Sequence, residues 1–430
     1  MKKKKILIIS YSYPPANVPA AQRPYSIAKY LDKEKFDVTV LTCGNQDSSL
    51  GFDNTFNEKL PNVNLIKVNG FKVSKNRTVA GKNNQKKTGL KEFLKKQIIK
   101  FLSYFIFPDK GIFWYPKVKK YIKANKDNLK FDVIFSTSPM FTNHLVAKQI
   151  KKINPNAMFI ADFRDFHYLD NEQLKRGVKP YLNKRLETKI IKSADKVTFI
   201  SDAMKNEYQN FYKQHHNKFY SIYNGFDPDE FSTNNFVPNK NQLSIFYAGS
   251  FYKGIRNPMP LFNILEQLLD EGFINNNDFK IEIAGNFEND LLKEIKHLKV
   301  FNSIVFLGQI PRNEVLKKYK QSHLLWLIVG NKVSHYTGVP VKFYEYLISQ
   351  RPIINFAPEN SEPTKIINEL NIGWNFDTDS YDFEKQINQF KDIFDKFKKG
   401  NLNQKIDFAS IEKYSREQQT KLLEEVINNV

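Results

Sequence analysis

The chain has 430 residues, which is too long for one ordinary hydrophobic core and predicts two or three domains. Hydrophobic residues make up 41% of the chain and charged residues 26%, a composition that fits a globular protein and excludes disorder of its main body. The formal charge of +21 favours an anionic partner, which could be nucleic acid, a phosphorylated metabolite or an acidic lipid surface. The lysine excess can equally be a compositional bias.

In the first half of the chain, short β-rich runs alternate with helical patterns such as 143–152 and 178–193. Continuous apolar runs of this length are typical of strands buried on both faces, and their alternation with helices predicts a parallel, doubly wound sheet. The predicted strands lie at 5–10, 37–43, 63–68, 131–138, 157–163 and 196–201.

The first of these strands leads into a loop with Pro14 and Pro15 and then a helix that carries Arg23 near its start. A strand, a tight loop and a helix N-terminus place unpaired backbone N–H groups where an anion can bind. We therefore expect part of a ligand site here, although the pattern does not name the ligand.

The stretch YSIYNGFDPDEF at 220–231 is rich in turn residues and marks a domain boundary. Five more strands, several ending in glycine, then predict a second doubly wound sheet, at 243–249, 279–285, 303–308, 323–329 and 352–356. We divide the chain into an N-terminal domain at 1–225, a C-terminal domain at 226–400 and a loop-and-helix segment at 401–430 that packs back on the N-terminal domain. The two sheets are expected to face one central cleft.

Cys43 is the only cysteine, so no disulfide can form within the chain, and its use fits the reducing cytoplasm. The start MKKKKILIIS has too short an apolar stretch for a secretory signal, and no apolar run reaches the roughly 18 residues of a membrane-spanning helix. We expect a cytoplasmic protein.

Eight motifs, in this order and spacing, resemble those of the bacterial family 4 retaining glycosyltransferases, which have the two-Rossmann-domain GT-B fold. They are ILIISYSYPP, TSPMFTNHLVA, ADFRDFHY, VTFISDAM, YNGFDPDEF, YAGSFYKGIRNP, FLGQIPRNEVLKKYKQSHLL and VPVKFYEYLISQRPII. The resemblance implies transfer of a sugar, with retention, from a nucleotide-sugar donor in the C-terminal domain to an acceptor in the N-terminal domain. It also implies a role in surface polysaccharide biosynthesis.

The donor site needs fixed positive groups and N–H dipoles, because the nucleotide diphosphate gains negative charge as the glycosidic bond breaks. Gly249 and Ser250 allow close backbone approach after a strand, and we expect Arg256, and secondarily Lys253, to bind the phosphates. The alternative is a surface loop with ordinary solvated charges.

The family often carries two glutamates seven residues apart at the donor site, and here only the second, Glu345, is present, with Thr337 at the first position. We assign Glu345 to the ribose hydroxyls. Lys342 lies on the same helix face and would pair with Glu345 or reach a phosphate. Glu345 could instead be an ordinary acid on a helix surface.

In the N-terminal domain, Asp162, Arg164 and Asp165 follow a strand within the motif ADFRDFH. The two carboxylates could hold or activate an acceptor hydroxyl, while the arginine orients them or meets the donor phosphate. An internal Asp–Arg ion pair is the alternative. Arg23 is either a further contact in the cleft or part of an ordinary helix start. His144 is equally a structural histidine or a site residue.

No His/Cys cluster suggests a metal, and the Asp-x-Asp matches at 227–229 and 377–379 lie in unsuitable places, so we expect no required metal or other cofactor. The substrate is expected to be a UDP- or GDP-sugar, and the acceptor a glycan or lipid-linked molecule. The alternatives are a nucleotide-sugar epimerase of the same architecture and a basic nucleic-acid-binding protein, although the chain has no recognisable nucleic-acid-binding module.

In residues 86–123, apolar side chains recur at helical spacing on one face, with lysines on its flanks. Trp114 and Tyr115 follow after a proline. The pattern is typical of an interfacial helix on an anionic leaflet and predicts peripheral attachment at the inner face of the cell membrane. The alternative is an amphipathic helix buried against the first sheet.

Overall fold

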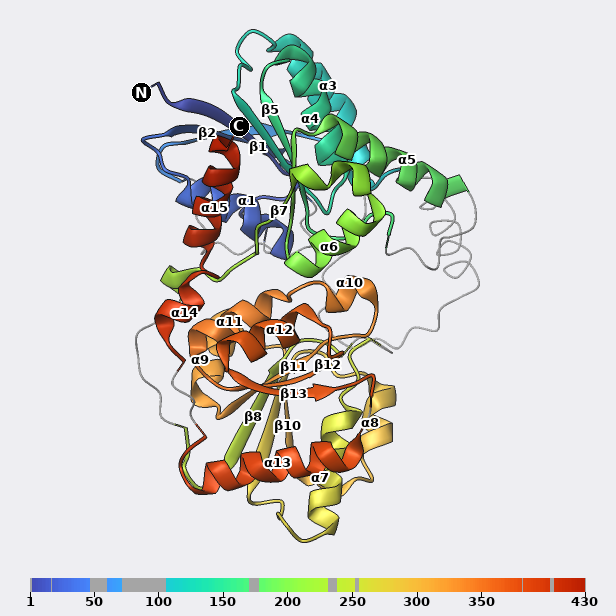
Figure 1. The fold of residues 1–430 in the computed structure, drawn as a ribbon, viewed down its shortest axis with the longest axis vertical. Coiled ribbons are helices and arrows are strands. Elements are labelled where there is room, and N and C mark those ends of the chain that lie inside the picture. The colour runs from blue at the N-terminus through green and yellow to red at the C-terminus, as the bar shows by residue number, and fades with distance from the viewer. Residues whose placement is uncertain are drawn as a thin grey trace, which may run out of the picture. The chain divides into compact units, whose positions relative to one another are not determined.

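The computed structural model describes residues 2–16, 18–46, 60–71, 106–169, 178–230, 238–251, 255–380, 382–402 and 406–429. It divides into two compact units (Figure 1). The N-terminal unit comprises 1–199, 208–222 and 420–430, and the C-terminal unit comprises 200–207 and 223–419. The predicted boundary after Gly225 lies close to the crossing at 222–223.

The N-terminal unit contains a seven-stranded parallel sheet with the strand order β3-β2-β1-β4-β5-β6-β7. All six predicted strands are present, and β7 is an addition at the edge. The strands are β1 (Lys4–Ile9), β2 (Phe36–Cys43), β3 (Val63–Val68), β4 (Val133–Thr137), β5 (Met158–Phe163), β6 (Lys196–Phe199) and β7 (Phe219–Ser221).

The central strands of this sheet are buried over most of their length, as their continuous apolar sequences predict. All five residues of β4 and the last four of β1 are buried. The described helices of this part of the chain are α1 (Pro19–Tyr30), α3 (Tyr115–Ala124), α4 (Thr142–Ile153), α5 (Val178–Ser193), α6 (Asp202–Phe211) and the 3-10 helices η2 (Lys110–Phe113) and η4 (Lys213–Lys218). The residues of α6 are divided between the two units.

The C-terminal unit contains a six-stranded parallel sheet with the order β10-β9-β8-β11-β12-β13. The five predicted strands are confirmed, and β13 is an addition at the edge. The strands are β8 (Leu243–Ala248), β9 (Phe279–Ala284), β10 (Ile304–Gly308), β11 (Leu324–Ile328), β12 (Ile353–Ala357) and β13 (Gly373–Asp377).

Two hydrophobic clusters form the core of the C-terminal unit, one including Leu265 and Trp326 and the other including Phe343 and Leu347. The helices are α7 (Met259–Asp270), α8 (Asn289–Ile295), α9 (Arg312–Gln321), α10 (Val333–Tyr336), α11 (Val341–Ser349), α12 (Glu362–Leu370), α13 (Phe383–Lys398), α14 (Phe408–Glu412) and the 3-10 helices η5 (Pro228–Glu230) and η6 (Lys299–Ser303). The fold class predicted from the sequence, α/β with two doubly wound parallel sheets, is confirmed.

The end of the chain differs in one respect from the sequence-based expectation. Phe408 and Ile411 belong to the first part of the 401–430 segment, which was expected to be a loop. They lie in the short helix α14, where Ile411 is buried in the C-terminal unit. The final helix α15 (Arg416–Asn428) places Leu423 and Ile427 in the core of the N-terminal unit. The apolar residues of this helix therefore complete the N-terminal core.

The segment predicted to lie on a membrane falls largely outside the described residues, which resume at 106. Its described end carries Trp114, which is buried and donates its indole N–H to the carbonyl oxygen of Val68 at 2.8 Å. This tryptophan therefore belongs to the core of the unit. In the parts of the chain that the structure describes, no helix combines the length and apolar character needed to cross a membrane.

Candidate functional site

In the N-terminal sheet, the strand order reverses between β1 and β4. Ligands of open α/β sheets bind at the carboxyl ends of the strands beside such a reversal. Thr137, Asp162 and Arg164 stand at or just after the carboxyl ends of β4 and β5. The predicted residues of the ADFRDFH motif thus lie at the expected edge of the sheet.

Asp162 forms a buried ion pair with Arg23 from α1. The Nε and Nη2 atoms of Arg23 donate to the two carboxylate oxygens at 2.9 and 2.7 Å, and the hydroxyls of Thr137 and Thr198 each donate at 2.6 Å. Burial alone would raise the pKa of Asp162, but the Arg23 guanidinium and these hydrogen bonds hold that pKa below its usual value. The aspartate therefore stays ionised and ties α1 to three strands.

This geometry favours the structural alternative for Asp162, although the partner is Arg23 rather than the neighbouring Arg164. Both carboxylate oxygens are engaged and the side chain is inaccessible to solvent. Arg23 is buried as well, with a 4% exposed side chain, so the pair presents little surface to a phosphate or sugar. The predicted contact of either residue with a substrate remains a prediction.

Arg164 fixes the start of α1. Its Nη1 and Nη2 atoms donate to the carbonyl oxygens of Ala20 and Pro19, each at 3.0 Å. In a regular helix the Ala20 carbonyl would accept from the N–H of residue 24, but that residue is Pro24, which has no N–H. The Arg164 guanidinium supplies the missing donor, so this arginine stabilises a helix whose own sequence interrupts its hydrogen bonds.

The other two predicted residues of this domain differ sharply in exposure. Asp165 is exposed, whereas His144 at the start of α4 is fully buried. The Nδ1 atom of His144 lies 2.7 Å from the hydroxyl of Ser136, and burial lowers the pKa of His144 to about 3. His144 is therefore a neutral side chain packed among aromatic rings, which favours its structural interpretation.

Glu187 of α5 hydrogen-bonds to the loop that carries Asp165. The carboxylate of this glutamate accepts the backbone N–H of Tyr168 at 2.9 Å and the phenol groups of Tyr208 and Tyr212 at 3.0 and 2.8 Å. Burial raises the pKa of Glu187 to about 7, although these three hydrogen bonds oppose the rise. No motif in the sequence predicted this cluster.

Glu187 should make stability depend on pH near neutrality. Its pKa is about 7 in the folded state against an ordinary 4.5, so between these values the folded chain binds more protons than the unfolded chain. The free energy of unfolding should therefore fall as the pH rises from about 5 to 7.5, by an amount on the order of 3 kcal/mol. Glu187→Gln removes this contribution.

Urea unfolding of both proteins at pH 5 and 7.5 checks this prediction. His144 and His167, whose pKa values are lowered by burial, change stability in the opposite sense in both proteins. The relevant quantity is therefore the free energy of unfolding of the wild type minus that of Glu187→Gln. This difference should fall as the pH rises from 5 to 7.5. A difference that does not vary with pH would contradict the raised pKa.

In the C-terminal unit, two glycines bring the ends of β8 and β9 into close contact. Gly249 and Gly285 have φ angles of +143° and +127°, which side chains rarely tolerate. A Cβ atom on Gly285 would lie 2.2 Å from the carbonyl oxygen of Gly249. This contact joins two strand ends, and the predicted approach of a phosphate to the Gly249 backbone stays a prediction.

Cationic side chains lie beside this pair of glycines. The Nη1 atom of Arg256 donates to the carbonyl oxygen of Ser250 at 3.3 Å, and the Nζ atom of Lys342 lies 3.9 Å from the ring centre of Tyr247. Burial lowers the pKa of Lys342 well below its usual value, and the nearby Arg256 lowers it further, whereas Glu345 opposes this. Three predicted donor residues are thus brought together, while Lys253 lies outside the described residues.

Glu345 is held by an arginine that sequence reasoning missed. The Nη1 atom of Arg312, at the start of α9, lies 2.7 Å from a carboxylate oxygen of Glu345, and the Tyr319 phenol also hydrogen-bonds to this carboxylate. Glu345 is only 7% exposed, so the interpretation as an ordinary surface acid does not fit. Arg312 follows β10 at a strand-to-helix junction within the motif FLGQIPRNEVLKKYKQSHLL. This position was the signal in the sequence that could have identified it as a site residue.

Thr337, which stands where the family often has a glutamate, is buried. Its hydroxyl donates to the carbonyl oxygen of Val333 at 2.5 Å, and its own carbonyl oxygen accepts from the hydroxyl of Ser201 at 2.5 Å. The residue therefore stabilises the short helix before α11. Within the described ranges, no group of three or more His, Cys, Asp or Glu side chains is placed to hold a metal ion.

Comparison with known proteins identifies related sequences and folds. The family model described as Glycosyltransferase Family 4 matches residues 20–230, and no curated protein matches the chain. Sucrose-phosphate synthase from Thermosynechococcus elongatus has a TM-score of 0.61 at 13% identity, covering 99% of this chain and 98% of its own. A glycosyltransferase from Rickettsia africae has a TM-score of 0.60 at 16% identity, covering 100% of both chains.

A third structure, HepE from Anabaena in complex with UDP-glucose, has a TM-score of 0.60 at 13% identity, covering 99% of this chain and 100% of its own. At these identities the likeness shows the fold. The two Rossmann-like sheets described above are the architecture that these proteins share.

Proposed function

The chain belongs to glycosyltransferase family 4 and has the GT-B fold, and on this premise we propose that it transfers a sugar from a UDP- or GDP-sugar to a glycan or lipid-linked acceptor, with retention at the anomeric carbon. We place this activity in surface polysaccharide biosynthesis, with peripheral attachment to the cell membrane. The observation that supports the proposal most is the set of Arg256, Lys342 and Glu345 beside the Gly249 backbone.

Each of these groups suits one part of a nucleotide sugar. The backbone at Gly249 admits a diphosphate closely because this residue has no side chain, and Arg256 supplies positive charge. A bound diphosphate would favour the protonated form of Lys342 and so oppose the lowering of its pKa by burial. Such charge stabilises the diphosphate as the glycosidic bond breaks. Glu345, oriented by Arg312, offers carboxylate oxygens to the ribose hydroxyls.

The sugar itself must be recognised without a carboxylate at residue 337. Thr337 directs its hydroxyl back to its own helix, so we assign it no sugar contact. In the N-terminal domain, which we propose to bind the acceptor, the exposed Asp165 is the accessible carboxylate of its motif. Asp162 acts there by fixing the scaffold through Arg23.

A panel of nucleotide sugars tested by thermal shift identifies the donor, because a ligand that binds only the folded chain raises its melting temperature. The identified donor is then incubated with and without acceptor glycans. Glycosyl transfer predicts a product that requires an acceptor, whereas release of a free monosaccharide without any acceptor would point to the epimerase alternative. A panel in which no nucleotide or nucleotide sugar shifts the melting temperature would contradict the proposal.

Glu345→Ala and Arg256→Ala should each weaken donor binding or turnover at least tenfold, about 1.4 kcal/mol. Calorimetric titration with the donor measures the binding part. Asp270→Ala is the control, because it removes an exposed carboxylate of the same unit that pairs with Lys299 on the surface. Donor affinity unchanged in both site variants, or reduced equally in the control, would remove this donor-site assignment.

A further inference from the structure

Helix α5 of the N-terminal unit exposes apolar side chains in its first turns. Val178 is 71% exposed, Tyr181 63% and Leu182 36%. The spacing of three and four residues places them on one face of the helix, and the opposite face, with Leu186, Ile190 and Ile191, is buried. Large apolar side chains that are this accessible and this close together need an explanation.

The same face becomes basic toward the C-terminal end of the helix. Arg185, Lys189 and Lys192 are exposed and continue the spacing of three and four residues from Leu182. The one acidic residue of α5, Glu187, is fully buried, so the helix exposes no negative charge. We call the six residues Val178, Tyr181, Leu182, Arg185, Lys189 and Lys192 the α5 face.

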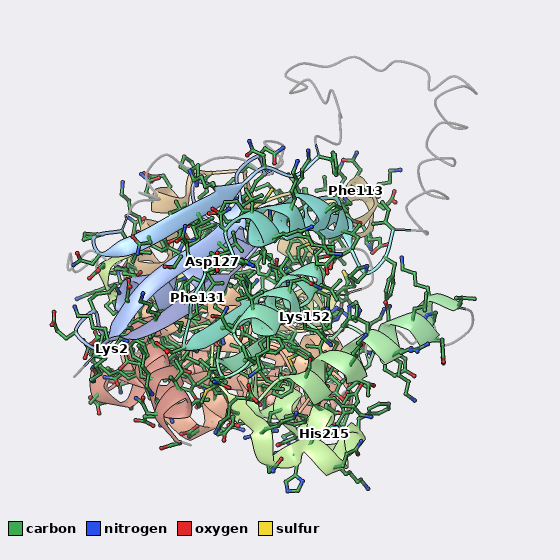
Figure 2. The ribbon with its side chains drawn as sticks, turned by 90° about the horizontal axis from the view of Figure 1, so that it is seen from above. Lys2, Phe113, Asp127, Phe131, Lys152 and His215 are labelled. Atoms are coloured by element: carbon green, nitrogen blue, oxygen red, sulfur yellow. The ribbon has the colours of Figure 1, made fainter. Side chains whose placement is uncertain are left out.

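A neighbouring helix extends the basic part of this face. On α4, burial lowers the pKa of Lys148, and the positive charges of Lys189 and Lys152 lower it further. The basic surface therefore continues from α5 onto α4, beside it, where Figure 2 labels Lys152.

The N-terminal end of α5 points away from the sheet of its unit in both views (Figures 1 and 2). We propose that the α5 face binds an anionic lipid bilayer, with the apolar first turns inserted at the headgroup level and the basic residues against the lipid phosphates. This inference gives a surface to the membrane attachment proposed above, but it does not depend on sugar transfer.

A bilayer fits this surface better than a macromolecular partner does. A stable protein interface uses about 20–30 residues on each side, far more than these few apolar side chains. Nucleic-acid sites combine a basic groove with aromatic stacking platforms, whereas α5 offers a projecting apolar end. An apolar face flanked by lysine and arginine is the arrangement that lies in a membrane interface.

Vesicle sedimentation tests the charge requirement with the full chain. Wild type should bind vesicles of phosphatidylcholine with 30% phosphatidylglycerol at low salt, and should bind phosphatidylcholine alone or high-salt samples weakly. The triple variant Arg185→Gln, Lys189→Gln, Lys192→Gln should bind at least tenfold more weakly. The control Lys293→Gln, Lys296→Gln, Lys399→Gln removes the same charge from exposed positions of the C-terminal unit and should bind like wild type.

Insertion of the apolar end is measured separately, with a dye on an introduced cysteine. The chain's own cysteine, Cys43, is buried and should not react with the dye. An environment-sensitive dye on Tyr181→Cys should brighten and shift to the blue on anionic vesicles, whereas the same dye on Lys293→Cys should not. The inference is overturned if wild type ignores anionic vesicles, if both triple variants lose binding equally, or if the dye on Tyr181→Cys does not respond. Salt-sensitive binding to polyuridylate without vesicle binding would favour nucleic acid instead, and thermal melts of all variants verify folding.

Discussion

Asp162→Ala is expected to lower the free energy of unfolding of the N-terminal unit by about 3–5 kcal/mol, the cost of leaving a buried charge without its partner. The Arg23 guanidinium would lose both of its carboxylate contacts, and the hydroxyls of Thr137 and Thr198 would lose their acceptor. Urea unfolding measures the loss, and hydrogen exchange of peptides covering β4, β5 and β6 locates it in the N-terminal sheet.

A double variant separates the charge effect from the loss of shape. Arg23→Met with Asp162→Asn leaves neither charge in the interior and keeps one side-chain acceptor for the threonines, so it should be more stable than Asp162→Ala. If Asp162→Ala fails to fold, recovery of folded protein by the double variant supports the same explanation. A loss below about 1 kcal/mol for Asp162→Ala would show that the ion pair is not what ties α1 to the strands.

The pH dependence provides a further check on this pair. The pKa of Asp162 is lower in the folded chain than its ordinary value, so the pair stabilises the fold above that ordinary value. Its contribution is lost as the pH falls through the lowered folded pKa. The wild type should therefore lose its advantage over Asp162→Ala only in strongly acidic solution.

The central strands could be predicted from the sequence because each is a continuous apolar run. The two strands that were missed, β7 and β13, each form one edge of their sheet, whereas β3 and β10 at the opposite edges were predicted. An edge strand has one neighbour and is partly exposed, so its sequence can be less apolar, as the half-buried GWNFD of β13 shows. The short β7 also overlaps the turn-rich stretch 220–231, which indicated a domain boundary rather than a strand.

The partners of charged residues could not be predicted in the same way. Arg23 and Asp162 are 139 residues apart, and several basic residues in the sequence were equally plausible partners for the aspartate. The same holds for Arg312 and Glu345, which come from different helices. Residue type and position in a motif predicted which side chains lie at the carboxyl ends of the strands. Packing decides which of these side chains form ion pairs within the protein.

Gly285→Ala is expected to have the second large effect, because it should disturb both stability and donor binding. The new Cβ atom would lie 2.2 Å from the carbonyl oxygen of Gly249, so the backbone of the proposed phosphate loop must move. The φ angle of +127° adds strain that alone costs about 1–3 kcal/mol. We expect a loss of stability of about 3 kcal/mol and at least a tenfold loss of affinity for UDP or GDP, whichever stabilises the wild type.

Gly272→Ala is the matched control for this substitution. Gly272 also has a positive φ angle, +67°, but nothing lies within 4 Å of its added Cβ atom, so only the backbone strain of about 1–2 kcal/mol applies. Thermal melts compare the two variants, and calorimetric titration with the nucleotide compares their affinities. If Gly272→Ala keeps wild-type affinity while Gly285→Ala loses it, the loss comes from displacement of the Gly249 loop. Wild-type affinity in a folded Gly285→Ala variant would mean that the nucleotide does not use this loop, because the loop cannot keep its position beside the added side chain.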